Sequence, residues 1–189
     1  MPASGVPGIH AIPLGSHLCV FYRSHKEFLR VTASFLNAGL SDNELCVWTL
    51  PAPLTIQLAV DELSRHGRDG QHLQATKQLQ IMSAHDCWFS PSPFDVERSL
   101  MRLASWSAAC HQLGYASVRA AGGPGQFLSE GSRQAFMRFE YDATAVIAKH
   151  PCIGLCCYPS THVSATDMFD IMNAHPWALL RTHSGWASI

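Results

Sequence analysis

The sequence has little charge, no long apolar run, and no glycine where a nucleotide-binding loop would need one. Charged residues make up 14% of its 189 residues, and the formal net charge is −1. Because nucleic-acid binders normally carry a basic surplus, this balance argues against direct contact with nucleic acid. A membrane-spanning helix would need about 18 consecutive apolar residues, and the sequence contains no such run. We therefore expect neither nucleic acid nor a membrane among its partners.

An export signal and a disulfide framework are missing as well. Residues 1–14 are rich in proline and glycine but show no basic segment followed by an apolar core. The seven cysteines are an odd number at uneven spacings, in a chain long enough to bury a sizeable core. We expect a cytoplasmic protein with a lead-in at 1–14 and a single domain at 15–189.

What the sequence does contain is an alternation of short apolar runs with amphipathic helical patterns, which is typical of βαβ units. The apolar runs HLCVFY and IGLCCY are continuous, which favours parallel strands covered on both faces. Glycines at 39, 67 and 114 are expected to end three of the helices. The sequence predicts an α/β fold, a three-layer α/β/α sandwich with a mostly parallel central sheet. Its expected strands are 17–22, 44–50, 79–84, 115–120, 153–158 and 178–183, and its expected helices are 26–38, 54–66, 93–113, 129–150 and 165–173.

The first strand, turn and helix are laid out as in a nucleotide-binding domain, but a phosphate-binding loop is missing. Such a loop needs glycines so that successive N–H groups can turn toward the phosphates, followed by a lysine and a serine or threonine. After the first expected strand there is no glycine before Gly39, and Lys26 alone cannot replace the loop. The glycine-rich segment AAGGPGQF, at 120–127, follows a later strand and is interpreted as a flexible connection or a ligand lid. The sequence therefore disfavours ATP hydrolysis.

Seven short segments occur in an order that resembles one known family. They are GSHLCVFY, FLNAGLSDNELCVW, CWFSPSPFD, GYASVRAAG, FEYDA, IGLCCYP and NAHPWALLR. The chain resembles the MEDS domain, a methanogen/methylotroph sensory domain named partly for a repressor of dichloromethane dehalogenation. The resemblance implies a sensor of small hydrocarbon derivatives, on a RecA/KaiC-like fold that has lost its P-loop.

The resemblance also has implications for partners. Family members usually carry a DNA-binding or histidine-kinase module, and no such module is recognisable here. The chain is then either an excised piece of a larger protein or a domain that signals to a separate regulator or histidine kinase. A homodimer is a further alternative that the sequence leaves open.

Aromatic residues mark the expected strand ends, where open parallel sheets bind their ligands. Such a ring would hold a small apolar or cationic molecule through dispersion and cation–π contacts. The alternative is that these large side chains cap the edge of the core. The residues at the strand ends are Tyr22, Trp48, Trp88 with Phe89, Arg119 and Tyr158.

Histidine and cysteine form a second group of candidates. His17 and Cys19 lie two residues apart on one strand, so both side chains point to the same face. They offer two ligands to a soft or borderline metal, to which Cys156 and His175 would be added. No cofactor is expected because no metal-binding spacing joins these residues, although a transition metal or haem stays open. The alternative is a core histidine with its hydrogen bonds satisfied, beside a buried cysteine.

Two further residues complete the predicted site. Glu140 lies inside a helical pattern between apolar neighbours, so its carboxylate needs a partner, and Arg119 is the one expected. His175 precedes Pro176 and is therefore held extended at a turn, where it would gate the pocket or act as an acid or base. The alternatives are that Glu140 is a half-exposed helix residue and that His175 only begins the last strand.

Three functions follow from these candidates. The favoured one is a non-catalytic sensory domain that binds a small organic molecule of the hydrocarbon-derivative or one-carbon type, with moving segments at 122–125 and 90–93. The second is a sensor that holds a metal or haem through histidine and cysteine. The third is a thiol-dependent enzyme, with Cys19 or Cys156 as nucleophile beside a histidine. Because no catalytic motif supports the third, the sequence predicts a protein that is not an enzyme.

Overall fold

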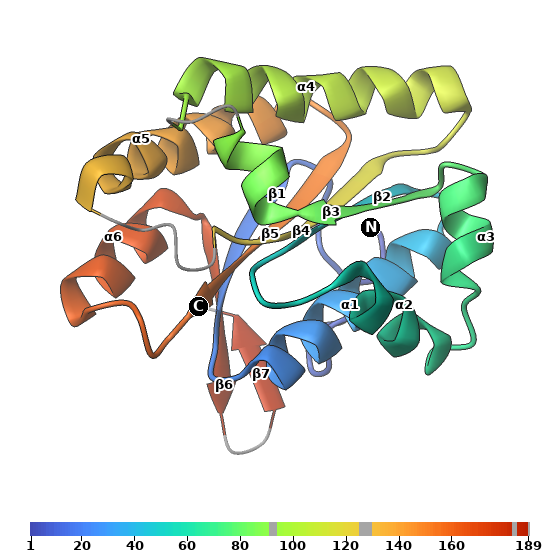
Figure 1. Ribbon diagram of the computed structural model, residues 1–189, viewed down its shortest axis with the longest axis horizontal. Helices are drawn as coiled ribbons and strands as arrows, with labels where there is room; N and C mark the ends of the chain where they lie inside the picture. The colour runs from blue at the N-terminus through green and yellow to red at the C-terminus, as the bar shows by residue number, and fades with distance from the viewer. Residues whose placement is uncertain (91–93, 125–129, 183–184, 189) are drawn as a thin grey trace.

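A seven-stranded sheet forms the middle layer of the computed structural model, which describes residues 1–90, 94–124, 130–182 and 185–188 (Figure 1). The strands follow the order β3-β2-β4-β5-β1-β6-β7. The first six are parallel to their neighbours, and only β7 pairs antiparallel, with β6. This confirms the mostly parallel sheet. The strands are β1 (Ser16–Tyr22), β2 (Leu45–Leu50), β3 (Leu79–Ser83), β4 (Val118–Gly122), β5 (Cys152–Pro159), β6 (Trp177–Thr182) and β7 (Gly185–Ser188).

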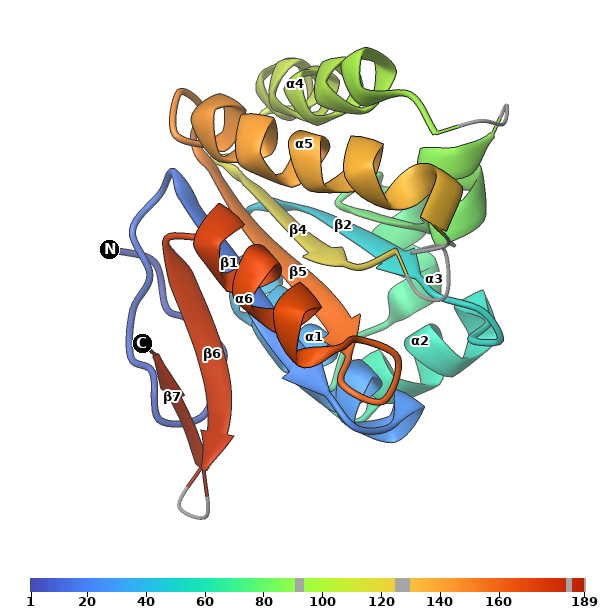
Figure 2. The same cartoon turned by 90° about the vertical axis from the view of Figure 1, so that its left-hand side faces the viewer.

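Helices cover both faces of this sheet and complete the predicted α/β/α sandwich (Figures 1 and 2). One face carries α1 (His25–Ser41), α2 (Ile56–Ser64) and the short α3 (Gly70–Ala75). The other face carries α4 (Val96–Leu113), α5 (Glu130–Ile147) and α6 (Ala165–Ala174). A single π-helical turn, η1 (His85–Phe89), follows β3. Short α3 and β7 were not among the predicted elements.

Of the glycines expected to end helices, Gly114 does so and Gly39 does not. Gly114 adopts the left-handed conformation, with φ of 77°, and caps α4 as predicted. Gly39 does not end α1, which continues to Ser41. A β-carbon at position 39 would lie 2.5 Å from Oε2 of Glu44 and 2.8 Å from Cδ of Arg119. This glycine therefore makes room for a buried ion pair instead of stopping the helix.

The strands divide their side chains between two apolar cores, because successive residues point to opposite faces. Leu18, Val20 and Tyr22 of β1 belong to the core under α1, while Cys19 belongs to the core under α4 and α5. In β4, which begins at Val118 and not at residue 115, Val118 packs toward α4 and α5. This division decides which of the predicted site residues can meet.

The connection from β1 to α1 consists of only two residues, Arg23 and Ser24. The Ser24 hydroxyl accepts a hydrogen bond of 3.2 Å from the Glu27 N–H and so caps the helix. A connection this short leaves no loop in which backbone N–H groups encircle phosphate. The segments expected to move, 122–125 and 90–93, lie outside the described residues at Gly125 and at 91–93.

Candidate functional site

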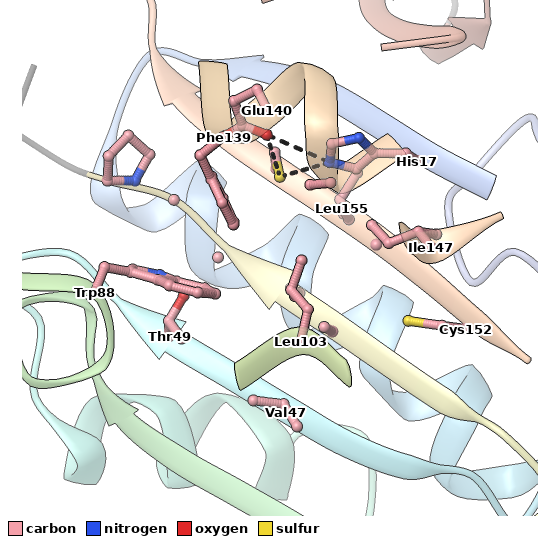
Figure 3. Close-up of a pocket in the computed structure, with 18 of the residues that line it drawn as sticks. His17, Val47, Thr49, Trp88, Leu103, Phe139, Glu140, Ile147, Cys152 and Leu155 are labelled. Carbon is pink, nitrogen blue, oxygen red and sulfur yellow. Dashed lines mark hydrogen bonds and ion pairs between the residues drawn. The ribbon is translucent and has the colours of Figure 1, made fainter. Parts of the chain in front are cut away.

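A cavity lies between the sheet and the helices α4 and α5 (Figure 3). It offers about 50 Å³ to the centres of water-sized molecules, so a molecule of only a few heavy atoms fits without rearrangement. Apolar side chains and glycines make up most of its wall. They include Val47 of β2, Trp88 of η1, Leu103 and Trp106 of α4, Ala120 and Ala121 of β4, and Phe136, Phe139 and Ala143 of α5.

A cluster of titratable residues closes one side of this cavity. We call it the His17 cluster; its members are His17, Glu140, Cys156 and His175, and their ligand atoms all lie within 4.8 Å of one another. The side chains of His17 and Glu140 are each 1% exposed, and that of His175 is fully buried. His17, Glu140 and Cys156 line the cavity, and Figure 3 shows His17 and Glu140 pointing toward one another.

The fold brings these residues together from four separate elements. His17 of β1 is paired with Gly154 of β5, and Cys156 follows two residues later on the same face. A β-carbon at position 154 would lie 3.3 Å from the His17 ring, so the glycine leaves space for that ring. Glu140 comes from α5. His175 follows the last residue of α6 and is extended, with φ of −117°, as its position before Pro176 predicts.

Hydrogen bonds from outside the cluster hold three of its side chains in place. Nδ1 of His17 lies 2.8 Å from the Thr144 hydroxyl, which itself donates to the Ala174 carbonyl at 2.8 Å. Because that hydroxyl has only one proton, Nδ1 of His17 is the donor. Nδ1 of His175 donates to the Ile171 carbonyl at 2.7 Å. The Tyr158 hydroxyl donates to Oε1 of Glu140 at 2.6 Å.

The remaining atoms of the cluster face inward and converge. Nε2 of His17 lies 3.2 Å from Sγ of Cys156 and 3.4 Å from Oε2 of Glu140. Nε2 of His175 is also 3.4 Å from Oε2, and Sγ of Cys156 is 3.6 Å from that same oxygen. The two imidazole rings are 4.1 Å apart, centre to centre. Nε2 of His175 is buried and has no hydrogen-bond partner among the described residues.

Burial and neighbouring charges set the protonation of the cluster. Burial, reinforced by His175, lowers the pKa of His17 to about 3, although Glu140 acts in the opposite direction. Burial raises the pKa of Glu140, but His175, His17 and the Tyr158 hydroxyl together outweigh it, so the pKa lies below its usual value. Burial and then Glu140 raise the pKa of Cys156 well above its usual value. At neutral pH the cluster therefore holds a neutral His17, a Glu140 carboxylate and a Cys156 thiol.

The predicted pairing of Arg119 with Glu140 is wrong. Nε of Arg119 donates to Oε2 of Glu44 at 2.5 Å, and both side chains are almost fully buried. Arg119 is the second residue of β4 and not its last, and its side chain lies under α1, as its contact with the Phe35 ring shows. It therefore points away from α5 and cannot reach Glu140.

The other predicted residues are divided between the two faces. Tyr22 and Trp48 lie in the core under α1, away from the cavity. Trp88 lines the cavity, and Tyr158 contacts Glu140. Cys19 shares a core with the cluster but contributes no ligand atom to it, and Glu140 takes that place. His17, Cys156 and His175 are brought together, as the sequence-based metal hypothesis required.

Thr144 and Gly154 were missed by the sequence analysis. Thr144 lies four residues after Glu140 on α5, so helical periodicity places it on the same face, and this signal was available. Gly154 lies in the apolar run of β5 and offers no such signal, because its role depends on which residue of β1 is beside it.

The chain is thus an α/β/α sandwich domain with an internal apolar cavity that a buried polar cluster closes on one side. It belongs to the MEDS family, described as the MEthanogen/methylotroph, DcmR Sensory domain, whose family model matches residues 16–176. This range includes all four members of the His17 cluster, and it makes the chain a sensory domain. A search of the curated proteins gave no match. Among the described residues, no helix is long and apolar enough to cross a membrane.

Proposed function

We propose that this sensory domain receives a small organic molecule, of the hydrocarbon-derivative or one-carbon type, in the cavity between the sheet and α4 and α5. The observation that carries this proposal is the cavity itself, which is small, mostly apolar and bounded on one side by members of the His17 cluster. Apolar walls bind such a molecule by dispersion and by displacing poorly bound water. A single hydroxyl, carbonyl or halogen on the ligand would face His17 and Glu140.

The cavity's size also suggests how binding is transmitted. Side chains of α4 and α5 form part of the cavity wall, so a ligand larger than a few heavy atoms must displace one of these helices. A ligand shifts a conformational equilibrium only through its different affinity for the two states. We propose that a shift of α5 transmits ligand binding to the partner, because α5 carries both Glu140 and much of the cavity wall. The receiver would be a separate regulator or histidine kinase.

The thiol-dependent enzyme is the weaker alternative. A cysteine nucleophile needs a lowered pKa and access to substrate. Burial, followed by Glu140, raises the pKa of Cys19 to about 12, and that of Cys156 lies well above its usual value. Both thiols therefore stay protonated at neutral pH, which favours a binding role over catalysis.

Descent from a RecA/KaiC-like ATPase stays part of the proposal. It is supported by the parallel α/β/α architecture together with the two-residue connection between β1 and α1, where such an ATPase would carry its phosphate loop. Nucleotide hydrolysis by the purified chain would contradict it.

Filling the cavity tests the ligand proposal. Ala120 lies in the cavity wall on β4, so Ala120→Leu should occupy the space while keeping the strand. Ala108 is exposed on α4, and Ala108→Leu is the matched control with the same chemical change. The midpoint of thermal unfolding is measured with a panel of short alcohols, haloalkanes and one-carbon compounds.

We expect at least one compound to raise the midpoint of the wild-type protein and of Ala108→Leu, but not that of Ala120→Leu. No shift with any compound at saturating concentration would contradict the proposal. An equal shift in both variants would place the binding site elsewhere on the molecule.

A further inference from the structure

We propose that the His17 cluster binds one divalent transition-metal ion, with Zn²⁺ as the first candidate, through Nε2 of His17, Oε2 of Glu140, Sγ of Cys156 and Nε2 of His175. This site goes beyond the proposed organic ligand and does not depend on it. The argument uses three features of the cluster: the direction of its lone pairs, its internal distances and its outer hydrogen bonds.

The first feature is that the inward atoms are acceptors that face one another. Both imidazoles use Nδ1–H to donate outward, to Thr144 and to the Ile171 carbonyl. With both rings neutral, as metal ligands are, each Nε2 presents a lone pair to the same carboxylate oxygen of Glu140, at 3.4 Å in both cases. In that state the Cys156 thiol is the one proton that the described residues direct into this space, and it cannot serve all three acceptors. A cation at the centre would satisfy all of them at once.

The second feature is the set of distances. A tetrahedral zinc ion has bonds of about 2.0–2.2 Å to nitrogen and oxygen and about 2.3 Å to sulfur, which place its ligand atoms about 3.3–3.7 Å apart. The four inward distances given above run from 3.2 to 3.6 Å. The remaining two pairs lie within 4.8 Å. The cluster therefore needs little rearrangement to surround an ion.

The third feature is the outer layer of hydrogen bonds. Metal-binding histidines almost always donate their second N–H to an oxygen, which fixes the ring and the tautomer. Both histidines do so here, and the Tyr158 hydroxyl holds the free oxygen of Glu140 in the same way. A buried histidine normally finds a hydrogen-bond partner for each ring nitrogen, but Nε2 of His175 has none among the described residues.

Charge and donor type agree with a divalent ion. Two imidazoles, one carboxylate and one thiolate form a mixed set of borderline and soft donors, which suits Zn²⁺, Co²⁺ or Fe²⁺ better than Mg²⁺ or Ca²⁺. Binding breaks the S–H bond of Cys156 and releases one proton to solvent, so the two anionic ligands balance the charge of the ion. Haem is disfavoured, because a porphyrin would have to separate donors that already converge.

The test uses the intact chain, stripped of metal with a chelator and then titrated with Zn²⁺ and with Co²⁺. We expect one ion per chain by calorimetry. With Co²⁺ we expect the intense visible bands of tetrahedral coordination and a thiolate-to-cobalt charge-transfer band. Cys156→Ala should abolish the charge-transfer band, and His175→Ala should weaken affinity by at least about 100-fold.

Cys19→Ala is the matched control, because Cys19 is a buried cysteine in the same core but outside the cluster. It should bind as the wild-type protein does. Circular dichroism of each metal-free variant shows whether it folds, and Cys156→Ser provides a second, milder replacement. The proposal is overturned if a folded wild-type chain shows no cobalt bands. It is also overturned if Cys19→Ala loses the charge-transfer band as Cys156→Ala does, or if the protein shows a haem spectrum without a bound ion.

The organic ligand is tested separately. Ala120→Leu should keep the cobalt spectrum while losing the response to the organic compounds. A chain that binds metal but no compound contradicts only the proposed function, and a chain that responds to a compound without binding metal contradicts only the metal site.

Discussion

Two glutamates are buried to the same extent on opposite faces of the sheet, and their surroundings differ sharply. Glu44 and Glu140 are each 1% exposed. Glu44 is surrounded by donors: Nε of Arg119 at 2.5 Å and the Ser117 hydroxyl at 2.9 Å. Nη2 of Arg119 donates to Oε1 of Glu44 at 3.4 Å, and Nη1 donates to the backbone carbonyls of Ala3, Ser4 and Phe35.

Glu140 has fewer donors around it than Glu44. Tyr158 donates to one oxygen, while the other lies 3.6 Å from the Cys156 thiol and faces the Nε2 atoms of two histidines. Burial alone therefore does not distinguish a structural carboxylate from one that could bind a ligand. The protons on the neighbouring atoms do, because donors complete a hydrogen-bond network and acceptors leave a place for a cation.

The largest expected effect on stability is at Glu44, whose carboxylate is fully hydrogen-bonded. Arg119→Met removes the guanidinium and leaves Glu44 charged and unpaired in the core, so the free energy of unfolding in urea should fall by about 3–5 kcal/mol. The control is Arg181→Met, which removes an ion pair with Glu27 in which Arg181 is 55% exposed. That change should lower the free energy of unfolding by less than about 1 kcal/mol. Equal losses in the two variants would mean that the buried pair is not structural.

The sequence predicts the layers well but not the two buried clusters. Continuous apolar runs and amphipathic helices are enough to predict the sandwich, because they report burial directly. The position of Arg119 was misjudged because β4 begins three residues later than its pattern suggests, which moves the strand end from Arg119 to Gly122. Because neighbouring residues of a strand point to opposite faces, Arg119 lies under α1 while Val118 packs toward α4 and α5.

Three of the four residues of the His17 cluster were among those that the sequence offered as possible metal ligands. Cys19 was expected in place of Glu140, since it shares a strand and a face with His17. Which cysteine lies beside the His17 ring depends on the register of β1 against β5, and the sequence does not encode that register locally. Likewise, the inward direction of Glu140 depends on how α5 is rotated against the sheet.

A smaller effect is expected from the outer layer of the cluster. Thr144→Val removes the hydroxyl that orients His17 while keeping the shape of the side chain, so the affinity for Zn²⁺ should fall by about 10–100-fold. Thr32→Val is the matched control, because Thr32 is a buried helical threonine whose hydroxyl donates to the Phe28 carbonyl at 2.7 Å on the opposite face. Calorimetric titration of both variants measures the difference. A similar loss of affinity in Thr32→Val would show that the effect is one of general stability.

The smallest effect is expected where the comparison is tested most directly, in metal-free protein. The Glu140→Gln amide can accept from Tyr158 and donate to Nε2 of His175, which has no hydrogen-bond partner in the part of the chain that the structure describes. The free energy of unfolding in urea with a chelator should therefore change by less than about 1 kcal/mol, because the amide keeps the hydrogen bond from Tyr158 and gains one to His175. Glu44→Gln is the matched control, and it should cost about 3 kcal/mol or more because it leaves Arg119 without its counter-ion. A large loss in Glu140→Gln would mean that the carboxylate of Glu140 holds the fold as that of Glu44 does, and the distinction between the two buried glutamates would then fail.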